Sequence, residues 1–595
     1  MPCILDIAFI PHIVRDIAAH LSIADVKRCS LTGPELYEAF SPFLGTSLTI
    51  SRDIEAMYRQ RILTMVLVKR GRFIRALFID TIDLPLNVLQ NVTNQCPAVT
   101  RFHSNVLAVP LNRRVQATFD YLARLSALER VSFTIHDLFV AFQDRLVPSL
   151  LRLTMVTDLR LEKGTWSSQG VLDLLEQLPR LQVFHLQAQK MVLNHAVEVF
   201  NRSDRQYPNL NELALGSSSV KGNSGPSMES FLLPLWQKCP HLETLWICGS
   251  SYTVARSTLP PLCDFLRQTS CSSSASASSA SFPKIRNIRL FNDRYPHEAI
   301  AEIVDALPNG QLRQWELLSS ISPWDAVPVH SWGERLVQNH FSSLEHVELT
   351  RGTLYNEDCR HTWVPTLLES CPRLRVLRAP AKVGMRGTGH VQRMISLDIR
   401  AAVQVTWACR DLEELDIPIV GACLTWPHDR CWDYISNRYL PQGQHDSLCE
   451  SYHRRFFCQL SRCRKMRRFS MGYNDRQGLV DNFPDETCHS LLNHDDCAPY
   501  TQSDDALPWT LGSGLEFLET SWKQLEYLGL AWTTHRAGMD ELQWMLQHWP
   551  RLKQIDGFWR VCDYVDNIDH ILFMDMHHPD VKLHNIVPRC GTKDP

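Results

Sequence analysis

Apolar residues recur along this chain in a short fixed pattern, in which apolar residues follow a leucine by three and five positions. The pattern is clear at Leu374, Leu377 and Ala379. Successive side chains of a β-strand point to opposite faces, so this spacing predicts a short strand with one buried face. Residues 364–369 just before it predict an amphipathic helix, and Pro372 separates the two because proline cannot continue a helix.

The same unit recurs from one end of the chain to the other. Copies with the proline start at Cys96, Leu178, Tyr207, Cys239, Cys371 and Trp549. Copies without it keep the apolar triplet, namely Leu128/Val131/Phe133, Ile285/Ile288/Leu290, Leu312/Trp315/Leu317, Leu344/Val347/Leu349, Leu412/Leu415/Ile417, Met466/Phe469/Met471 and Leu525/Leu528/Leu530. Most neighbouring copies are about 25–32 residues apart, close to the period of leucine-rich repeats. A single unit cannot bury its apolar face, so the copies predict a stacked array.

The predicted fold class is therefore α/β, a leucine-rich-repeat solenoid. We expect an irregular horseshoe with a parallel sheet on its concave face and helices on its convex face. A chain of 595 residues is too long for one compact core, but a solenoid escapes this limit because each repeat contacts only its neighbours.

Composition narrows the class of partner. Hydrophobic residues make up 44% of the chain and charged residues 21%, as in folded soluble proteins. The formal net charge of −3 argues against nucleic acid or an anionic membrane as the main partner. No apolar run approaches the roughly 18 residues of a membrane-spanning helix. We therefore expect protein partners, with no nucleic acid and no membrane.

The first residues of the chain and its cysteines indicate the cellular compartment of the protein. The first residues lack a basic segment, and Asp6 and Pro11 interrupt their apolar character, so they do not form a secretory signal. We therefore expect a cytoplasmic or nuclear protein whose 19 cysteines are reduced thiols. Cysteines of the Cys-Pro turns are expected to pack under the next strand, as small apolar side chains do.

Residues 1–46 differ from everything after them. Apolar residues within 12–21 form one helical face, Ser22 is an N-cap candidate for a helix over 23–31, and Gly33-Pro34 separates that helix from another over 35–40. Three short helices form a small cluster with more apolar surface than they can bury among themselves. The spare surface requires a partner or the adjoining repeats.

These residues resemble an F-box. The resemblance covers residues 10–50 and rests on the Ile10-Pro11 opening, on Ile23-Ala24-Asp25-Val26, on Cys29-Ser30-Leu31 and on the ending from Tyr37 to Leu44. With the repeats behind it, the layout is similar to F-box/leucine-rich-repeat proteins of a type common in fungi. F-boxes of this kind dock on the Skp-family adaptor of cullin–RING ubiquitin ligases. The adaptor-binding residues that the resemblance implies are Ile10, Pro11, Ile13, Val14, Ile17, Leu21, Val26, Leu31, Tyr37 and Leu44.

The sequence departs from the F-box pattern at two positions. Leu36 and Gly45 stand where the family usually has tryptophan, and tryptophan is a frequent hot spot of interfaces. These departures put adaptor binding in doubt. The alternative is that residues 1–46 only cap the open end of the repeat array.

The solenoid is expected over residues 47–556, followed by a C-terminal cap over 557–595 that contains strands near 571–574 and 581–584. Loop insertions are expected near 216–226, 268–282, 418–460 and 472–512. The last two are rich in Cys and His, but Cys458 and Cys463 lack the tight paired spacing of zinc ligands, so no metal is assigned. Insertions of solenoids tend to lie on the binding face, so we expect these two to contribute to target selectivity.

No motif in the sequence indicates an enzyme. The nucleophile elbow, the His-Glu-x-x-His helix and the dinucleotide fingerprint are all missing, so we assign no catalytic residue and no cofactor. The resemblance implies a substrate-recognition subunit of a Skp–cullin–F-box ubiquitin ligase, which binds the adaptor, and through it cullin, by its N-terminal helices and a target protein by its repeats. The alternatives are a repeat scaffold without ligase association and a small-ligand receptor closed by the insertions.

Overall fold

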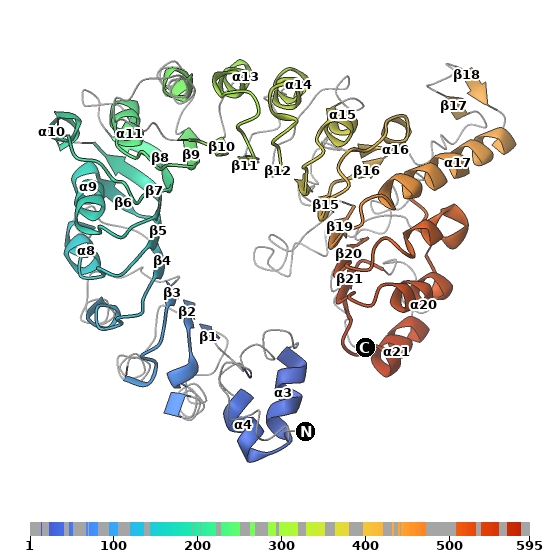
Figure 1. Ribbon diagram of the computed structural model, residues 1–595, viewed down its shortest axis with the longest axis horizontal. Helices are drawn as coiled ribbons and strands as arrows, with labels where there is room; N and C mark the ends of the chain where they lie inside the picture. The colour runs from blue at the N-terminus through green and yellow to red at the C-terminus, as the bar shows by residue number, and fades with distance from the viewer. Residues whose placement is uncertain are drawn as a thin grey trace, which may run out of the picture. The chain divides into compact units, whose positions relative to one another are not determined.

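Short parallel strands, each joined to the next by a helix or turn, make up both units into which the structure divides (Figure 1). The structure, a computed structural model, has one unit of residues 1–250 with 275–284 and another of 251–274 with 285–595. It describes residues 14, 23–40, 47–51, 67–68, 71–80, 94–104, 119–135, 143–193, 196–202, 204–221, 228–249, 262–267, 284–292, 297–318, 329–350, 363–379, 397–420, 431–433, 438–440, 442–471, 507–530, 537–558 and 568–584.

In the described part of the first unit, N-terminal helices precede a parallel sheet. Its strands pair in the order β1-β2-β3-β4-β5-β7-β8-β9, and β6 pairs with the end of β7. The strands are β1 (Ser47–Ser51), β2 (Ala76–Asp80), β3 (Arg101–Ser104), β4 (Arg130–Ile135), β5 (Asp158–Lys163), β6 (Thr165–Ser167), β7 (Val183–Val192), β8 (Glu212–Lys221) and β9 (Thr244–Gly249). The helices are α3 (Ile23–Leu31), α4 (Pro34–Phe40), the 3-10 turn η2 (Gly71–Phe73), α8 (Gln143–Leu150), α9 (Ser168–Gln177), α10 (Ala196–Arg202) and α11 (Met228–Gln237).

The second unit is built in the same way. Its parallel sheet has the order β10-β11-β12-β13-β15-β19-β20-β21-β22. These strands are β10 (Asn287–Asn292), β11 (Gln314–Leu318), β12 (His346–Thr350), β13 (Val376–Arg378), β15 (Glu414–Asp416), β19 (Arg468–Ser470), β20 (Tyr527–Gly529), β21 (Gln554–Asp556) and β22 (Lys582–His584). Two small pairs stand apart from it, β14 (Leu397–Asp398) with β16 (Ile419–Val420), and β17 (Cys431–Asp433) with β18 (Arg438–Leu440).

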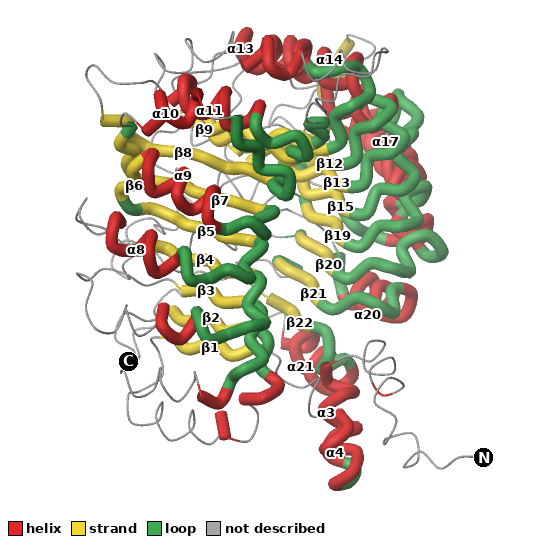
Figure 2. Tube along the Cα trace, turned by 60° about the vertical axis from the view of Figure 1, so that its left-hand side comes forward, coloured by secondary structure: helices red, strands yellow, loops and turns green. Residues whose placement is uncertain are grey.

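The helices of the second unit lie on one side of this sheet, as Figure 1 shows for α13, α14 and α15. Figure 2 shows the strands of each unit side by side like the rungs of a ladder. The helical elements are α13 (His297–Ala306), α14 (Val329–His340), α15 (Trp363–Ser370), α16 (Ile399–Ala402), α17 (Gln442–Leu460), η5 (Leu511–Ser513), η6 (Leu515–Leu518), α20 (Met539–His548) and α21 (Ile568–His577). We call the opposite side the open face of the sheet.

The apolar triplets of the sequence form the core. Leu374 and Leu377 are 0% exposed, and Leu377 is in register with Val347 on one side and Leu415 on the other. Cys371 is also fully buried beneath the strand that follows it. Each triplet is thus covered by its neighbours, and the predicted leucine-rich-repeat solenoid is confirmed.

Two backbone hydrogen-bond patterns recur in many of the leucine-rich repeats. Before many of the strands a tight turn closes, as when the Leu374 N–H donates to the Cys371 carbonyl at 3.2 Å. Next, the N–H groups of Arg375 and Val376 both donate to the Glu345 carbonyl, at 2.8 and 3.1 Å. The backbone therefore fixes each strand against the previous one even where the strand has only three residues.

Indole rings fill the space between sheet and helices in part of the second unit. The ring centroids of Trp315 and Trp332 are 5.9 Å apart, and those of Trp332 and Trp363 are 5.7 Å apart. Aromatic pairs at this separation add stabilisation beyond their buried area. These rings connect β11, α14 and α15 into one packed core.

Three sequence predictions are wrong within the described residues. Residues 216–221, expected as an insertion, extend β8, which pairs with β7 as far as Lys221. Residues 442–460, also expected within an insertion, form α17, whose buried Phe456 and Phe457 face the core. Residues 571–574, expected as a strand, belong to α21, whereas the strand expected near 581–584 is present as β22.

Other predicted insertions lie mainly outside the described residues. This applies to the stretch near 268–282 and to 472–506. The end of the last insertion is described, and there Leu507 and Trp509 are fully buried. Those residues therefore belong to the core.

Gly333 in α14 provides a test of the indole packing. A Cβ at this position would lie 2.2 Å from Nε1 of Trp363, so Gly333→Ala forces the indole or the helix to move. We expect destabilisation of about 1–3 kcal/mol, although alanine normally favours a helix over glycine. The midpoint of urea denaturation measures the effect. Gly512→Ala, whose Cβ would meet no atom within 4 Å, is the control and should be near neutral.

His340 provides a test of pH dependence. It is fully buried at the end of α14, and burial lowers its pKa from 6.5 to about 4. The unfolded chain therefore binds a proton that the folded chain rejects, so stability is constant above about pH 6.5 and falls as the pH drops toward 4. At about pH 5 this loss is roughly 2 kcal/mol.

His340→Leu should remove that part of the acid sensitivity, measured as the change in urea midpoint between neutral pH and about pH 5. The exposed His241, replaced by Gln, is the control and should leave the acid sensitivity as it is. An unchanged acid sensitivity in His340→Leu would contradict the assignment.

Candidate functional site

Charged side chains occupy equivalent positions on the open face of the second unit. The strand register places Arg289 beside Glu316, Glu316 beside Glu348, and Glu348 beside Arg378. These residues lie one position away from the buried triplet residues on each strand, so they point to the other face. The same alternation that builds the core therefore places a row of charges on the open face.

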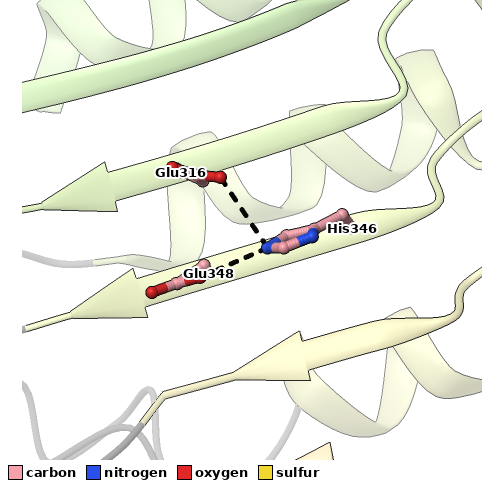
Figure 3. Close-up of side chains that lie close together, drawn as sticks. All are labelled: Glu316, His346 and Glu348. Carbon is pink, nitrogen blue, oxygen red and sulfur yellow. Dashed lines mark hydrogen bonds and ion pairs between the residues drawn. The ribbon is translucent and has the colours of Figure 1, made fainter. Parts of the chain in front are cut away.

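The first part of this row is centred on His346. Arg289 Nε lies 2.9 Å from a carboxylate oxygen of Glu316. The His346 imidazole nitrogen Nε2 lies 3.9 Å from Glu316 and 3.3 Å from Glu348. Figure 3 marks both contacts with dashed lines. Arg378 then contacts Glu348 at 3.0 Å. Two arginines thus flank a pair of glutamates and a histidine across four neighbouring strands.

The row continues over the next strands. Arg378 donates to both oxygens of Glu414, at 2.8 and 2.6 Å, and Arg468 lies 3.1 Å from Glu414. The guanidinium of Arg468 is 3.9 Å from the ring centroid of Tyr527. The hydroxyl of Tyr527 donates to Asp556 at 2.7 Å. We call the row from Arg289 to Asp556 the charge ladder.

The carboxyl groups in the ladder differ in their affinity for protons. Burial raises the pKa of Glu316 despite the attraction of Arg289. Burial acts in the same direction on Glu348, but its hydrogen bond with His346 and the charge of Arg378 outweigh burial and lower its pKa. The hydrogen bonds to Glu414 raise the pKa of Arg378. Arg378 therefore favours the charged form of Glu348.

Glu316, His346 and Glu348 are close enough to be considered as metal ligands. Their ligand atoms lie within 4.8 Å of one another. However, Arg289 and Arg378 already neutralise the two carboxylates, and a cation placed between them would be repelled by both guanidinium groups. The cluster is better explained as part of the charge ladder than as a metal site.

A second row of ion pairs joins residues that lie one position before strands β13, β15, β19, β20 and β21 of the same unit. Arg375 contacts Glu413 at 2.6 Å. Glu526 contacts both Arg467 and Lys553, each at 2.8 Å. These pairs are more exposed than the charge ladder, so each contributes little to stability.

A shorter cluster lies on the sheet of the first unit, at strand positions that alternate with the buried ones, and we call this face the open face of the first unit. Arg160 donates to both oxygens of Asp158, at 2.9 and 3.2 Å. His185 lies 2.7 Å from Glu212, and its ring centroid is 4.4 Å from that of Trp246. Both units therefore present polar, paired side chains on this face.

The N-terminal helices contain a separate small core. Val14, Val26 and Phe40 are buried together, and Leu36 packs against them from a half-buried position. Val14 and Val26 were assigned to the adaptor surface by resemblance, but here they hold the helices together. Of the other assigned residues, Leu31 is 74% and Tyr37 38% exposed.

The remaining adaptor-surface residues, Ile10, Pro11, Ile13, Ile17, Leu21 and Leu44, lie outside the described residues, as does Gly45. Sequence reasoning did not find the charge ladder. The available signal was that strand positions between the buried ones hold Arg and Glu, as in Arg378 and Glu348. The pairing of these residues depends on the register of strands far apart in the chain.

Comparison with known proteins adds little beyond the fold. No protein-family model matches the chain, and no curated protein matches it. Among solved structures, the Rad7 and Elc1 complex of yeast is similar with a TM-score of 0.34 and 10% identity, over 71% of this chain and 90% of that one. The TLR13–ssRNA13 complex is similar with a TM-score of 0.27 and 14% identity, over 87% of this chain and 65% of that one.

The helices were also compared with the dimensions of a lipid bilayer. Within the described ranges, no helix has the length and apolar character needed to span a membrane.

Arg378 provides a test of the charge ladder. Arg378→Ala leaves Glu348 and Glu414 partly buried without their shared cation, so we expect destabilisation of about 1–3 kcal/mol. Arg375→Ala, one residue before the same strand and in an exposed pair, should cost less than about 0.5 kcal/mol. The urea midpoints of both variants measure the difference. Equal midpoints would contradict a structural role of the ladder.

Proposed function

We propose that this protein is the substrate-recognition subunit of a Skp–cullin–F-box ubiquitin ligase. In this role the N-terminal helices hold a Skp-family adaptor and the leucine-rich repeats hold a target protein. The observation that carries the proposal is the F-box-like sequence of residues 10–50 followed by repeats that form a solenoid.

The exposed side chains of the N-terminal helices support this role. Leu31 ends α3 with 74% of its surface exposed, and Tyr37 on α4 is 38% exposed. The described members of the small core on these helices all belong to residues 14–40. An apolar and an aromatic residue exposed on a compact helical pair are suited to the core of a protein interface.

The repeats supply the second surface. Their open face carries polar side chains held in place by ion pairs, as in the charge ladder. Preorganised side chains lose little freedom on binding, which favours recognition of a specific partner. The protein then contributes by proximity, since it brings a target to the transferring enzyme while the bond chemistry takes place on other subunits.

Adaptor binding tests the proposal. We expect the purified chain to retain a Skp-family adaptor in a pull-down, and the double variant Leu31→Asp with Tyr37→Asp to lose at least about tenfold in affinity because charge enters an apolar interface. The control is Leu572→Asp with Met576→Asp, which changes two exposed residues of α21 and should leave adaptor binding unchanged.

Exposed positions are chosen because substitution at Val14 or Val26 would disrupt the small core itself. If the wild-type chain fails to retain the adaptor, the ligase role is wrong and the alternative of a repeat scaffold without ligase association takes its place.

A further inference from the structure

The turns that precede the strands of the second unit share one geometry. In five consecutive repeats the N–H of the first triplet residue donates to the carbonyl three positions earlier, at 3.0–3.3 Å. The turns are those before β13, β15, β19, β20 and β21, closed by the pairs Leu374–Cys371, Leu412–Cys409, Met466–Cys463, Leu525–Trp522 and Leu552–Trp549. The two residues inside each turn therefore occupy equivalent places along one edge of the sheet.

These turn positions are strongly basic. They hold six basic residues against one acidic residue, Asp411, in a chain whose formal net charge is −3. We call the six the basic edge, which consists of Arg373, Arg410, Arg464, Lys465, Lys523 and Arg551. The equivalent turn before β22 holds Pro579 and Asp580, so the basic edge ends there.

The other turns of this type hold few basic residues. In the first unit the turns before β2, β4, β5, β7, β8 and β9 hold two arginines, Arg72 and Arg180, and one histidine, His241. The basic residues are therefore concentrated in five neighbouring repeats and do not follow from the repeat pattern itself.

The four arginines of the basic edge are available to a partner. Each is exposed, and none forms an ion pair with another described residue. By contrast, Lys465 is paired with Asp411 at 3.1 Å and the Lys523 ammonium donates to the His548 carbonyl at 3.1 Å. Strands in a sheet lie about 4.8 Å apart, so the five turns span roughly 20 Å.

The chemistry of the edge favours carboxylate groups over nucleic acid. Arginine binds carboxylates with two parallel hydrogen bonds, and an extended peptide of about six residues covers the same 20 Å. Sequence-tolerant binding of single-stranded nucleic acid uses exposed aromatic rings for base stacking. The aromatic residues next to these turns, Trp522 and Trp549, are buried at 0% and 1% exposure.

We propose that the basic edge binds an extended acidic segment, rich in Asp and Glu, of a partner protein. This inference deepens the proposed function, since it names the kind of target that the repeats take. It concerns the second unit alone and does not depend on the adaptor.

Binding of a fluorescein-labelled hexaglutamate peptide to the full chain, followed by fluorescence anisotropy at low salt, tests the proposal. We expect saturable binding that weakens as salt is added, because the contacts are exposed ion pairs. Replacing Arg373, Arg410, Arg464 and Arg551 together with alanine should weaken binding roughly tenfold or more. The same four replaced with lysine should give an intermediate affinity, since the charge is kept but the paired hydrogen bonds of the guanidinium groups are lost.

Arg180→Ala is the matched control, because Arg180 is exposed in the same kind of turn outside the basic edge. The proposal is overturned if the four-alanine variant binds as the wild type does, or if no saturable binding is found. It is also overturned if a labelled single-stranded oligonucleotide of equal charge binds more tightly and loses its binding in the same variant. Adaptor retention by the four-alanine variant should be unchanged, so failure here is distinct from failure of the ligase role.

Discussion

The structure depends on the burial of each apolar triplet by its neighbours. A strand of three residues, such as β13, is too short to be stable alone, but Leu374 and Leu377 are completely covered once β12 and β15 lie on either side. This mutual covering makes the stability of the array a sum of local interfaces. It also explains why the buried strand residues of the second unit remain apolar although they differ in size. Leu528 and the much larger Trp315 occupy equivalent positions, and both are fully buried.

Burial of the triplet residues on one face of the sheet determines which side chains lie next to each other on the opposite face. Side chains alternate along a strand, so fixing the triplet residues fixes the open-face residues in register with one another. Arg378 and Glu414 meet although 36 residues separate them, and Arg467 meets Glu526 across 59 residues. The charge ladder is therefore a consequence of the core, and the intervening segments can be long because loop closure becomes only slowly more costly with length.

The sequence predicted the repeated elements well because local patterns determine them. The triplets all lie in the core, and the helix expected over 364–369 is present as α15, Trp363–Ser370. Predictions were wrong where composition was used in place of periodicity. Tyr452, Phe456 and Leu460 have the four-residue spacing of a buried helical face, but the richness of that region in Cys and His suggested an insertion.

A second kind of error has a different cause. Residues 571–574 are all apolar, and a short apolar run is compatible with either a strand or a helix. In α21 Met574 of this run is buried, whereas Leu572 is 50% exposed. The run is a helix because it belongs to the connection between β21 and β22, and this context is not visible within four residues.

The two candidate binding regions follow different rules from the core. The charge ladder consists of paired groups that are already satisfied, whereas the arginines of the basic edge form no ion pair among the described residues. The ion pairs of the charge ladder fix the conformations of their own side chains. An arginine without an ion pair contributes to binding only when a partner supplies the anion. Because the basic residues of these turns are exposed, their charge can change without disturbing the buried triplets. Recognition can thus vary at the edge of the sheet while the register of the strands stays fixed.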